Sequence, residues 1–433
     1  MGGVRVATEL VTLDDFNTIP SRAPVVATDI SESVRVVPVP EALAQLETTL
    51  DRTFPTIKEE TKACCAVAAT LLLDDQVNPV ALNWEGVPSS VKTTMLSFFD
   101  GAKDQVYKTD KFTPKSFVSH SANTRRADLD KIDLLPRIKH RVFLVPELAP
   151  IFGLRADDLL ETFSILTRIL DGQGFWSDSG VQGRRGYSGD YYFAWIGCTT
   201  PIPHRVWKTM STLGSRFLFM EMPDGDKPLD DLVDDLLAPT SFPERVAACR
   251  EAVTTLVASM WAENGGVRGV HWERNQDPRD VVRVIGRYAQ LLARLRGTIS
   301  VWREESGDHE THNFSTPVIE QPHRAMSLLY ALARGHALIH GRRQLTEADL
   351  PIVARAALES TPHDRRAVMR LLIEDENGVV SAAEVEKAIH CSRPTARAIM
   401  ETLGRLQIGV FDNPDPPEPA TLTLAEDLRC DRA

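Results

Sequence analysis

The chain has 433 residues, 43% of them hydrophobic and 25% charged, a composition that excludes a protein whose main state is disordered. Its 49 Lys and Arg residues against 60 Asp and Glu give a net charge of -11. This charge argues against a chain that coats nucleic acid with its whole surface and leaves only local basic patches to consider. The longest apolar run, AVAATLLL at 66–73, is far shorter than the roughly 20 residues that cross a bilayer, so we expect no membrane partner.

The N-terminal segment carries β-branched clusters broken by Pro and Ser and lacks helical periodicity, so we treat residues 1–50 as an ill-defined leader without activity. It starts with MGGVRVATELVTLDD, which has neither a charged stretch before an apolar one nor a small-residue cleavage site. We therefore expect no export signal and a cytoplasmic location. The six cysteines show no C-x-x-C spacing, which predicts buried thiols rather than disulfides or a zinc site.

From Pro40 to Leu73 apolar positions recur at three- and four-residue spacing around Pro55, which predicts two amphipathic helices. Short strand-like segments follow at long intervals, at 80–84, 116–120, 141–145, 191–197 and 216–220. Helix-like segments separate most of them, at 92–99, 154–170 and 204–213. Crossovers of a dozen or more residues are typical of a parallel sheet covered by helices, so we predict an α/β domain over 51–225.

The segment GVPSSVKTT at 86–94 lies between the first of these strands and a helix. It matches the spacing of the phosphate loop G-x-x-x-x-G-K-T, except that Val91 stands where the second Gly is expected. In such a loop backbone N–H groups surround the phosphates of a nucleotide, while Lys92 adds charge and Thr93 reaches Mg²⁺. The other candidate contacts are Gly86, Pro88, Ser89, Ser90 and Thr94. A β-branched residue tolerates the dihedral angles of that Gly poorly, so the alternative is an ordinary strand–turn–helix corner with a surface Lys.

The segment HRVFLVPELAP at 140–150 has Pro146 and Glu147 directly after an apolar strand. P-loop ATPases carry Asp and then Glu at the end of such a strand, and the Asp supports Mg²⁺ while the Glu polarises the attacking water. Here the Asp is absent, so Glu147 is the candidate general base and Mg²⁺ would depend on Thr93, water and the triphosphate. The alternative is a Glu that begins a helix after a Pro.

Thr199 and Thr200 end the next strand, YYFAWIGCTTP. Either hydroxyl would lie between Glu147 and the γ-phosphate and position the water, although Thr before Pro and a helix is also a capping pattern. Arg216, before the strand-like FLFMEMP, and Arg324, at the start of a helix, are candidates to neutralise charge on the γ-phosphate of a neighbouring subunit or of the same one. An ordinary surface salt bridge is the alternative for each arginine.

With the phosphate loop, the Glu-bearing strand, the polar strand end and the two arginines in this order, residues 60–350 resemble an AAA+ ATPase. The chain is most similar to the helicase-related and MoxR-like groups, because DGQGFWSDSGVQGRRGYSGDYYFAWIGCTTP resembles a β-hairpin inserted before the sensor strand. The resemblance implies ATP and Mg²⁺ as cofactors, ATP hydrolysis, and a homo-oligomeric ring or partial ring with ATP at the subunit boundaries. Arg216 would then be the finger supplied to a neighbour and Arg324 the second sensor, while Val91 and Pro146 predict slow turnover.

The acidic, Pro-bounded PDGDKPLDDLVDDLLAP at 223–239 predicts a surface connection into an all-helical region that ends near Ser360. The resemblance makes 226–360 a helical lid domain over a P-loop core. Upstream, the segment 115–141 holds seven Lys or Arg against three Asp, and the hairpin candidate adds Arg184 and Arg185 beside aromatic residues. Such a surface suits the backbone of a nucleic acid, and a solvated loop whose arginines pair with neighbouring subunits is the alternative.

The last region, 361–433, contains a helix, a turn at 390–392 and a second helix that starts at Arg393, followed by the β-like ATLTL. This small domain resembles a winged helix, in which Arg393 and Arg397 would contact the major groove of DNA. Basic and acidic residues balance over 363–411, with seven of each. Contact with a protein partner is therefore the alternative.

Our first hypothesis is an oligomeric AAA+ ATPase that couples ATP binding and hydrolysis to the remodelling of DNA or to movement along it. A second hypothesis is a nucleotide-switched scaffold or regulator with little turnover, which Val91 and Pro146 allow. A third is a MoxR-like chaperone that acts on a protein partner.

Overall fold

The computed structural model describes residues 35–120, 128–180, 183–214, 216–223, 228–306, 309–414 and 417–428. Most of the expected leader at 1–50 therefore lies outside the described residues, and its described end already belongs to helix α1. From Arg35 onward the chain forms one unit. Within the described ranges, no helix combines the length and the apolar character needed to cross a membrane.

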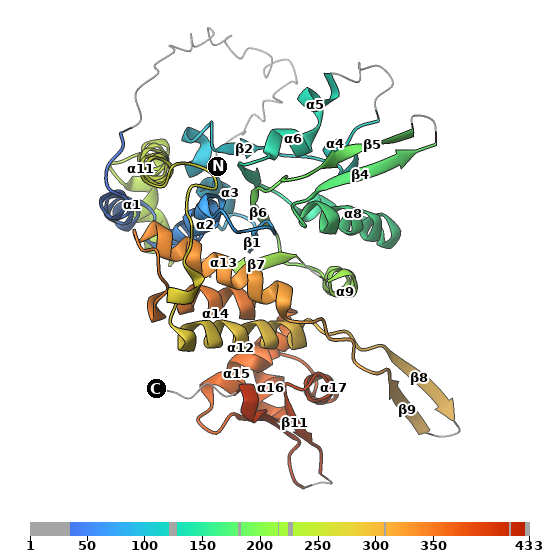
Figure 1. Ribbon diagram of the computed structural model, residues 1–433. Helices are drawn as coiled ribbons and strands as arrows, with labels where there is room; N and C mark the ends of the chain where they lie inside the picture. The colour runs from blue at the N-terminus through green and yellow to red at the C-terminus, as the bar shows by residue number, and fades with distance from the viewer. Residues whose placement is uncertain are drawn as a thin grey trace, which may run out of the picture. The chain divides into compact units, whose positions relative to one another are not determined.

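A five-stranded sheet lies at the centre of this unit, with the strand order β2-β3-β6-β1-β7 (Figure 1). Its strands are β1 (Ala81–Glu85), β2 (Val106–Lys108), β3 (Val142–Val145), β6 (Ala194–Thr199) and β7 (Phe217–Glu221). Every neighbouring pair is parallel, which confirms the predicted α/β class with a parallel sheet. Helices lie in the long connections between these strands, as parallel neighbours require.

The prediction of a strand at 116–120 is wrong. Residues Pro114–Phe117 form the short helix α4, and the edge strand of the sheet is β2, which we did not predict. Thr113 and Ser116 cap each other's backbone N–H groups, and Pro114 takes the first helical position. This combination starts a helix, so local capping overrides the β-like composition of the segment.

Helices cover both faces of the sheet. One face carries α1 (Val39–Thr53), α2 (Lys58–Ala69), α3 (Lys92–Ser97), α11 (Phe242–Glu263), α12 (Arg279–Leu295), α13 (His323–Ile339) and α14 (Leu350–Glu359). The other face carries α4, α6 (Leu134–Ile138), α7 (Ala149–Phe152), α8 (Ala156–Ile169) and α9 (His204–Leu213). Alternate residues of a strand point to opposite faces, so Leu82 and Trp84 join the first core and Ala81 the second. Two further helices are α5 (Leu129–Ile132) and α10 (Leu229–Leu237).

The region expected to be a helical lid, 226–360, shares its core with the sheet. Buried residues of α11, α13 and α14 belong to the same hydrophobic cluster as Leu82 and Trp84 of β1. Helix α13 packs along α2 so closely that a Cβ on Gly335 would lie 2.1 Å from the carbonyl oxygen of Ala66. Only Gly permits this approach, so the sequence at this point fixes α13 against α2.

Two antiparallel hairpins interrupt the helical segments (Figure 1). The first joins β4 (Gly174–Ser179) to β5 (Gly183–Ser188), in the segment that resembles an inserted hairpin. The second joins β8 (Val301–Ser306) to β9 (His309–Phe314), so the expectation of an all-helical region up to Ser360 is wrong here. Neither strand of the second hairpin carries an apolar stripe at helical spacing, and pairing satisfies their backbone groups instead.

The C-terminal segment combines three helices with a three-stranded antiparallel sheet of order β10-β12-β11. In chain order its elements are α15 (His363–Glu374), β10 (Val379–Ser381), α16 (Ala382–Ile389), α17 (Arg393–Arg405), β11 (Gly409–Asp412) and β12 (Thr421–Leu424). The turn between α16 and α17 lies where we expected it: His390 has a φ of 53° and Ser392 caps α17. A separate core fills this region and also takes in Leu291 and Leu295 of α12.

Candidate functional site

The carboxyl ends of the parallel strands meet at one edge of the sheet. The connection from β1 leads across β6 and β3 to the far edge strand β2, whereas β7 lies on the opposite side of β1. The chain therefore leaves β1 at the point where the strand order reverses, and in open α/β sheets ligands bind at such a point, beyond the carboxyl ends of the strands. This geometry directs attention to the loop after β1, residues 86–91.

Lys92 lies at the centre of this loop. Its side chain is buried, and Nζ donates to the carbonyl oxygens of Gly86 and Val87, at 2.6 and 2.7 Å, and to Oγ of Ser90 at 3.0 Å. Burial lowers the pKa of Lys92, while the acidic groups of Cys198 and Glu147 act in the opposite direction. The ammonium is thus held inside the loop, within electrostatic reach of Glu147.

Val91 adopts a left-handed backbone conformation, with φ 58° and ψ 10°. This is the region in which Gly is free and a β-branched residue is strained, at a cost of about 1–2 kcal/mol. The side chain of Val91 is half-buried against the core under the sheet, and this packing offsets part of the cost. The loop therefore reaches the shape that a Gly would adopt freely.

The remaining loop residues present their groups in different ways. Pro88, Ser89 and Thr93 are exposed, Thr94 is half-buried and Ser90 is buried. Gly86 donates its N–H to the carbonyl oxygen of Thr199 at 3.1 Å. A Cβ on Gly86 would lie 2.7 Å from Oγ of Ser90 and 3.0 Å from the side chain of Met222, so a larger residue at this position would displace both side chains. The hydroxyl of Thr93, in the first turn of α3, is open to a ligand above the loop.

Strand β6 lies between β1 and β3, so Thr199 and Thr200 lie between the loop and Glu147. Thr199 is buried and its hydroxyl donates to the carbonyl oxygen of Thr200 at 2.9 Å. Glu147 is half-buried, and its Oε1 accepts from the N–H of Ala149 at 2.8 Å. This hydrogen bond is the one expected if Glu147 begins a helix, which is the alternative role of this residue. The second carboxylate oxygen, Oε2, remains available to a ligand.

Arg216 and Arg324 lie at the other edge of the sheet. Arg216 directly precedes β7, whose first residue pairs with Ala81 at the start of β1. The loop lies at the opposite end of β1. Five strand residues at about 3.3 Å each put about 16 Å between the start of β1 and the loop. Arg216 is buried, lies 3.2 Å from Asp171 and donates to the carbonyl oxygens of Leu213 and Gly214. Arg324 lies 3.9 Å from the same Asp171. The two arginines therefore lie near each other and not near the loop of their own chain.

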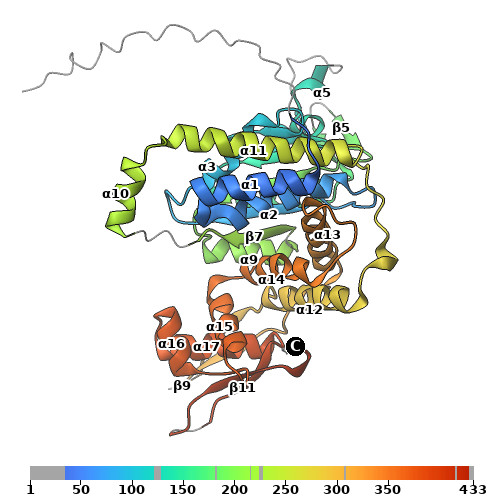
Figure 2. The same cartoon turned by 90° about the vertical axis from the view of Figure 1, so that its left-hand side faces the viewer.

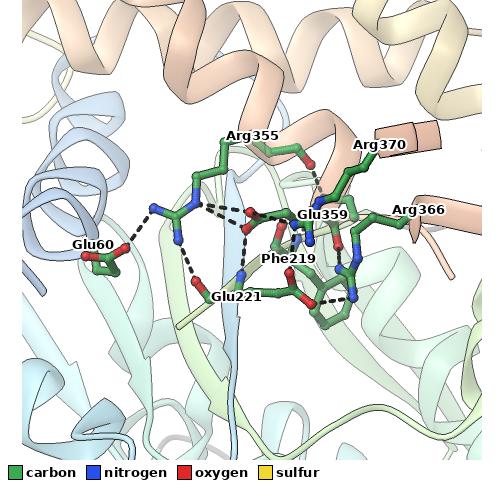
Figure 3. Close-up of polar contacts among 9 residues, drawn as sticks. Glu60, Phe219, Glu221, Arg355, Glu359, Arg366 and Arg370 are labelled. Atoms are coloured by element: carbon green, nitrogen blue, oxygen red, sulfur yellow. Dashed lines mark hydrogen bonds and ion pairs between the residues drawn. The ribbon is translucent and has the colours of Figure 1, made fainter. Parts of the chain in front are cut away.

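A cluster of charged residues that we did not predict (Figure 3) shares a cavity with the loop. Glu221, the last residue of β7, accepts from Arg366 at 2.6 Å and from Arg370 at 2.8 Å. Arg355 of α14 spans from Glu60 of α2, at 2.8 Å, to Glu359 at 3.2 Å. The cluster joins segments as far apart as Glu60 and Arg355, so no sequence spacing indicates it.

A cavity of about 590 Å³ separates this cluster from the loop. Its wall includes Gly86, Ser90 and Glu85. Glu85 is buried, and its Oε1 accepts from the N–H of Ile202 at 2.8 Å. Its Oε2 has no hydrogen-bond partner among the residues that the structure describes. Burial raises the pKa of Glu85 above its usual value. A charged residue at the end of the buried strand ALNWE, directly before the loop, was the sequence signal for this acceptor.

The metal and cysteine chemistry of the described ranges is limited. No group of three or more His, Cys, Asp or Glu residues there is arranged to hold a metal ion. Cys64, Cys65, Cys198 and Cys249 are buried free thiols, as predicted, while Cys391 is half-buried and Cys430 lies outside the described residues.

The candidate nucleic-acid contacts differ in availability. Arg185 is almost fully covered and lies 2.5 Å from Asp133, so it is engaged within the chain. Arg184 is exposed, with its guanidinium stacked 4.6 Å from the centre of the Trp176 ring. On α17, Arg393 is exposed and lies 3.1 Å from Glu386. Arg397 is half-buried, and its buried Nε has no partner within the described ranges.

Comparison with known proteins adds no assignment. No model of a known protein family matches the chain, and a search of curated proteins gives no match. The chemistry of the site therefore rests on its own residues.

Proposed function

We propose that the protein binds ATP with Mg²⁺ through residues 86–94 and belongs to the AAA+ ATPases. One observation carries this proposal: the buried Lys92 ammonium at the centre of the loop that leaves β1, held there by two carbonyl oxygens and one hydroxyl. A triphosphate would replace these neutral acceptors by charged oxygens, and charge-assisted hydrogen bonds are the stronger ones. Lys92 needs only a small movement to make this exchange.

Hydrolysis would depend on the neighbouring strand ends. Bound ATP would supply the phosphoryl group, and Glu147 would hold the attacking water with its free oxygen. Thr200, half-buried at the end of the strand between the loop and Glu147, would orient that water. Thr93 would support Mg²⁺ in the absence of the Asp that Pro146 replaces.

A second candidate function is a nucleotide-switched regulator with little turnover. Three observations favour it: Glu147 already accepts a backbone N–H, Arg216 is buried against Asp171, and Val91 strains the loop. Each of these features affects a residue that ATP hydrolysis would need more than ATP binding would. A measured rate of turnover decides between the two candidates.

We also propose that residues 361–433 form a winged helix, because their order of three helices and three antiparallel strands resembles that domain. The start of α17, with the exposed Arg393 and the half-buried Arg397, would then contact DNA or a protein partner. A DNA substrate predicts ATP turnover that rises when DNA is added. A MoxR-like chaperone predicts indifference to DNA and a response to its protein partner.

The experiment that tests the nucleotide site is a binding titration with fluorescent ATP and Mg²⁺ on the parent chain and on Lys92→Ala. We expect the parent to bind and Lys92→Ala to bind at least about 100-fold more weakly, a loss of about 2.7 kcal/mol. Lys103→Ala, which removes an exposed lysine of the same α/β region, is the matched control and should bind like the parent. A parent that binds no nucleotide, or a Lys92→Ala protein that binds and hydrolyses ATP normally, would contradict the proposal.

A further inference from the structure

The segment 200–203 connects β6 to α9 and passes the carboxyl end of β1. Strand β1 lies between β6 and β7, and the chain runs from β6 through α9 to β7, so this connection crosses β1. Figure 2 shows α9 beside β7, and the ring centres of Trp207 and Phe219 lie 5.1 Å apart across their contact. The crossing therefore takes place where Glu85 ends β1 and the loop 86–91 begins.

Two prolines leave this segment with little capacity to donate backbone hydrogen bonds. Residues 201–203 are Pro201, Ile202 and Pro203. Proline has no backbone N–H, so Ile202 supplies the one N–H donor of these three residues. The segment follows the end of β6 at Thr199, so this donor needs an acceptor other than the strand ladder.

Glu85 provides that acceptor. Its Oε1 accepts from the N–H of Ile202 at 2.8 Å. The residue is 7% exposed, and its Oε2 has no hydrogen-bond partner in the described part of the chain. Burial of a carboxylate is costly unless hydrogen bonds compensate for it. The bond to Ile202 therefore stabilises both groups, the buried acceptor and the donor of the crossing segment.

Thr200 lies between two anchors. On one side, a backbone N–H of the loop lies 3.1 Å from the carbonyl oxygen of Thr199, which ties the strand end to the loop. On the other side, Glu85 holds the N–H of Ile202. The backbone between the anchors is stiff, because Pro201 has its φ fixed at about −65° and keeps the preceding residue out of the helical region. A displacement of Ile202 would therefore displace Thr200 as well.

We propose that Glu85 is a positioning residue for the hydroxyl of Thr200. By holding Ile202, Glu85 sets the distance between Thr200 and the loop, and thus the place where Thr200 orients the attacking water. Glu85 acts through the backbone of residues 200–202 and not by contact with ATP. The inference rests on the proposed hydrolysis of ATP at the loop, in which Thr200 has this role.

A negative charge beside the loop is the other role open to Glu85. Glu221 lies opposite Glu85 on the neighbouring strand β7, and its carboxylate is paired with Arg366 and Arg370. Charge and hydrogen bonding make different demands on the side chain. The bond to Ile202 needs an oxygen at the right distance, whereas an electrostatic role needs only the charge. Substitutions that keep one property and remove the other therefore separate the two roles.

Steady-state hydrolysis of ATP by the full chain with Mg²⁺ is measured for three variants of this residue. Glu85→Gln keeps the acceptor and loses the charge, Glu85→Asp keeps the charge on a side chain one methylene group shorter, and Glu85→Ala loses both. We expect kcat of Glu85→Gln to stay within about 3-fold of the parent, and kcat of the other two to fall by at least about 10-fold, because misplaced groups lose catalysis steeply. KM for ATP should change by less than about 3-fold in all three, since the loop itself is intact.

Hydrogen exchange of the Ile202 amide measures the contact independently of turnover. Since neither Pro201 nor Pro203 has an amide proton, exchange within 201–203 reports Ile202 alone. Exchange should be at least about 10-fold faster in Glu85→Asp and Glu85→Ala than in the parent and Glu85→Gln, because the hydrogen bond that protects this amide is lost.

Glu263→Ala is the matched control. Glu263 ends α11, and its Oε2 accepts from the N–H of Val39 at 3.1 Å, so the variant removes a carboxylate that makes the same kind of bond in another part of the chain. It should leave both kcat and the exchange at Ile202 unchanged. Urea unfolding of each variant identifies any loss of fold. If Glu85→Ala does not fold, the comparison of Glu85→Gln with Glu85→Asp provides the test.

Three results would overturn the proposal while the parent still hydrolyses ATP. Equal kcat for the parent and Glu85→Ala would show that catalysis does not depend on Glu85. A low kcat of Glu85→Gln would show that the charge is needed and not the hydrogen bond. Unchanged exchange at Ile202 in Glu85→Ala would exclude the contact itself. A parent that hydrolyses no ATP would overturn the proposed hydrolysis and this inference together, so the two failures are distinguishable.

Discussion

The left-handed conformation of Val91 leads to an inverted order of stability among its variants. At φ 58° and ψ 10°, any residue with a Cβ carries a strain of about 1–2 kcal/mol. Val91→Gly removes this strain and loses about 0.5–1 kcal/mol to the greater freedom of Gly in the unfolded chain. Val91→Ala keeps the strain, and both variants lose the partial packing of the valine methyl groups.

We therefore expect Val91→Gly to be more stable than Val91→Ala by about 0.5–1 kcal/mol. At an ordinary exposed helical position the order is the reverse, with Ala favoured by about 1 kcal/mol. Ala398→Gly, at an exposed position within α17, is the matched control and should lose that amount. The Gly variant should also bind ATP more tightly than the parent, because phosphates approach a backbone without a side chain more closely.

The assay is urea unfolding followed by tryptophan fluorescence, since Trp84 lies in β1 directly before the loop. The two Val91 variants are compared at the same temperature and pH. If Val91→Ala equals or exceeds Val91→Gly in stability, the left-handed conformation is not the one that the protein adopts, and the case for a phosphate loop with this shape fails.

Three further outcomes follow from the packing and charges. Gly335→Ala should lower the free energy of unfolding by more than about 2 kcal/mol, because its Cβ would lie 2.1 Å from the carbonyl oxygen of Ala66. Urea unfolding measures this loss. An unchanged urea midpoint would mean that α13 and α2 are farther apart than described. Arg366→Met should lower the free energy of unfolding by about 3 kcal/mol, because the buried Arg366 lies 2.6 Å from Glu221 and its removal leaves the Glu221 carboxylate with one partner less. A loss below about 1 kcal/mol in urea unfolding would show that this ion pair contributes little to stability. Burial, with positive neighbours, lowers the pKa of His340 from 6.5 to about 4. The folding stability that the neutral His340 contributes is therefore present above pH 6.5 and decreases by about 2 kcal/mol as the pH falls toward 4. Unfolding curves of His340→Gln at pH 7 and 4.5 should lack that part of the pH dependence.

Local patterns in the sequence predicted much of the core architecture. The strand before the loop, the strand before Pro146 and helix α9 lie within one or two residues of their expected bounds, because alternating or helical apolar spacing reflects burial directly. The failures have local causes as well. A capping box turned the expected strand at 116–120 into helix α4, and short paired strands replaced helix at 301–314.

The candidate site divides in the same way. The loop, Glu147 and Thr200 were found from their spacing along the chain, and they meet because they follow neighbouring strands. The charged cluster around Glu221 and Arg355 was missed, since its members come from α2, β7, α14 and α15. Arg216 and Arg324 were expected near phosphate, and their distance from the loop became apparent only when the direction of β7 was known.

Sequence alone determined the class of the fold and the chemical groups of the loop, because periodic burial and a contiguous motif are properties of neighbouring residues. Tertiary structure decided which distant charges pair, that Glu85 keeps a buried oxygen without a partner among the described residues, and that the apolar side chains of α10 are exposed there. These depend on which surfaces meet after folding. A residue pattern specifies that a side chain tends to be buried or exposed, but only the packing of whole elements determines what lies against it.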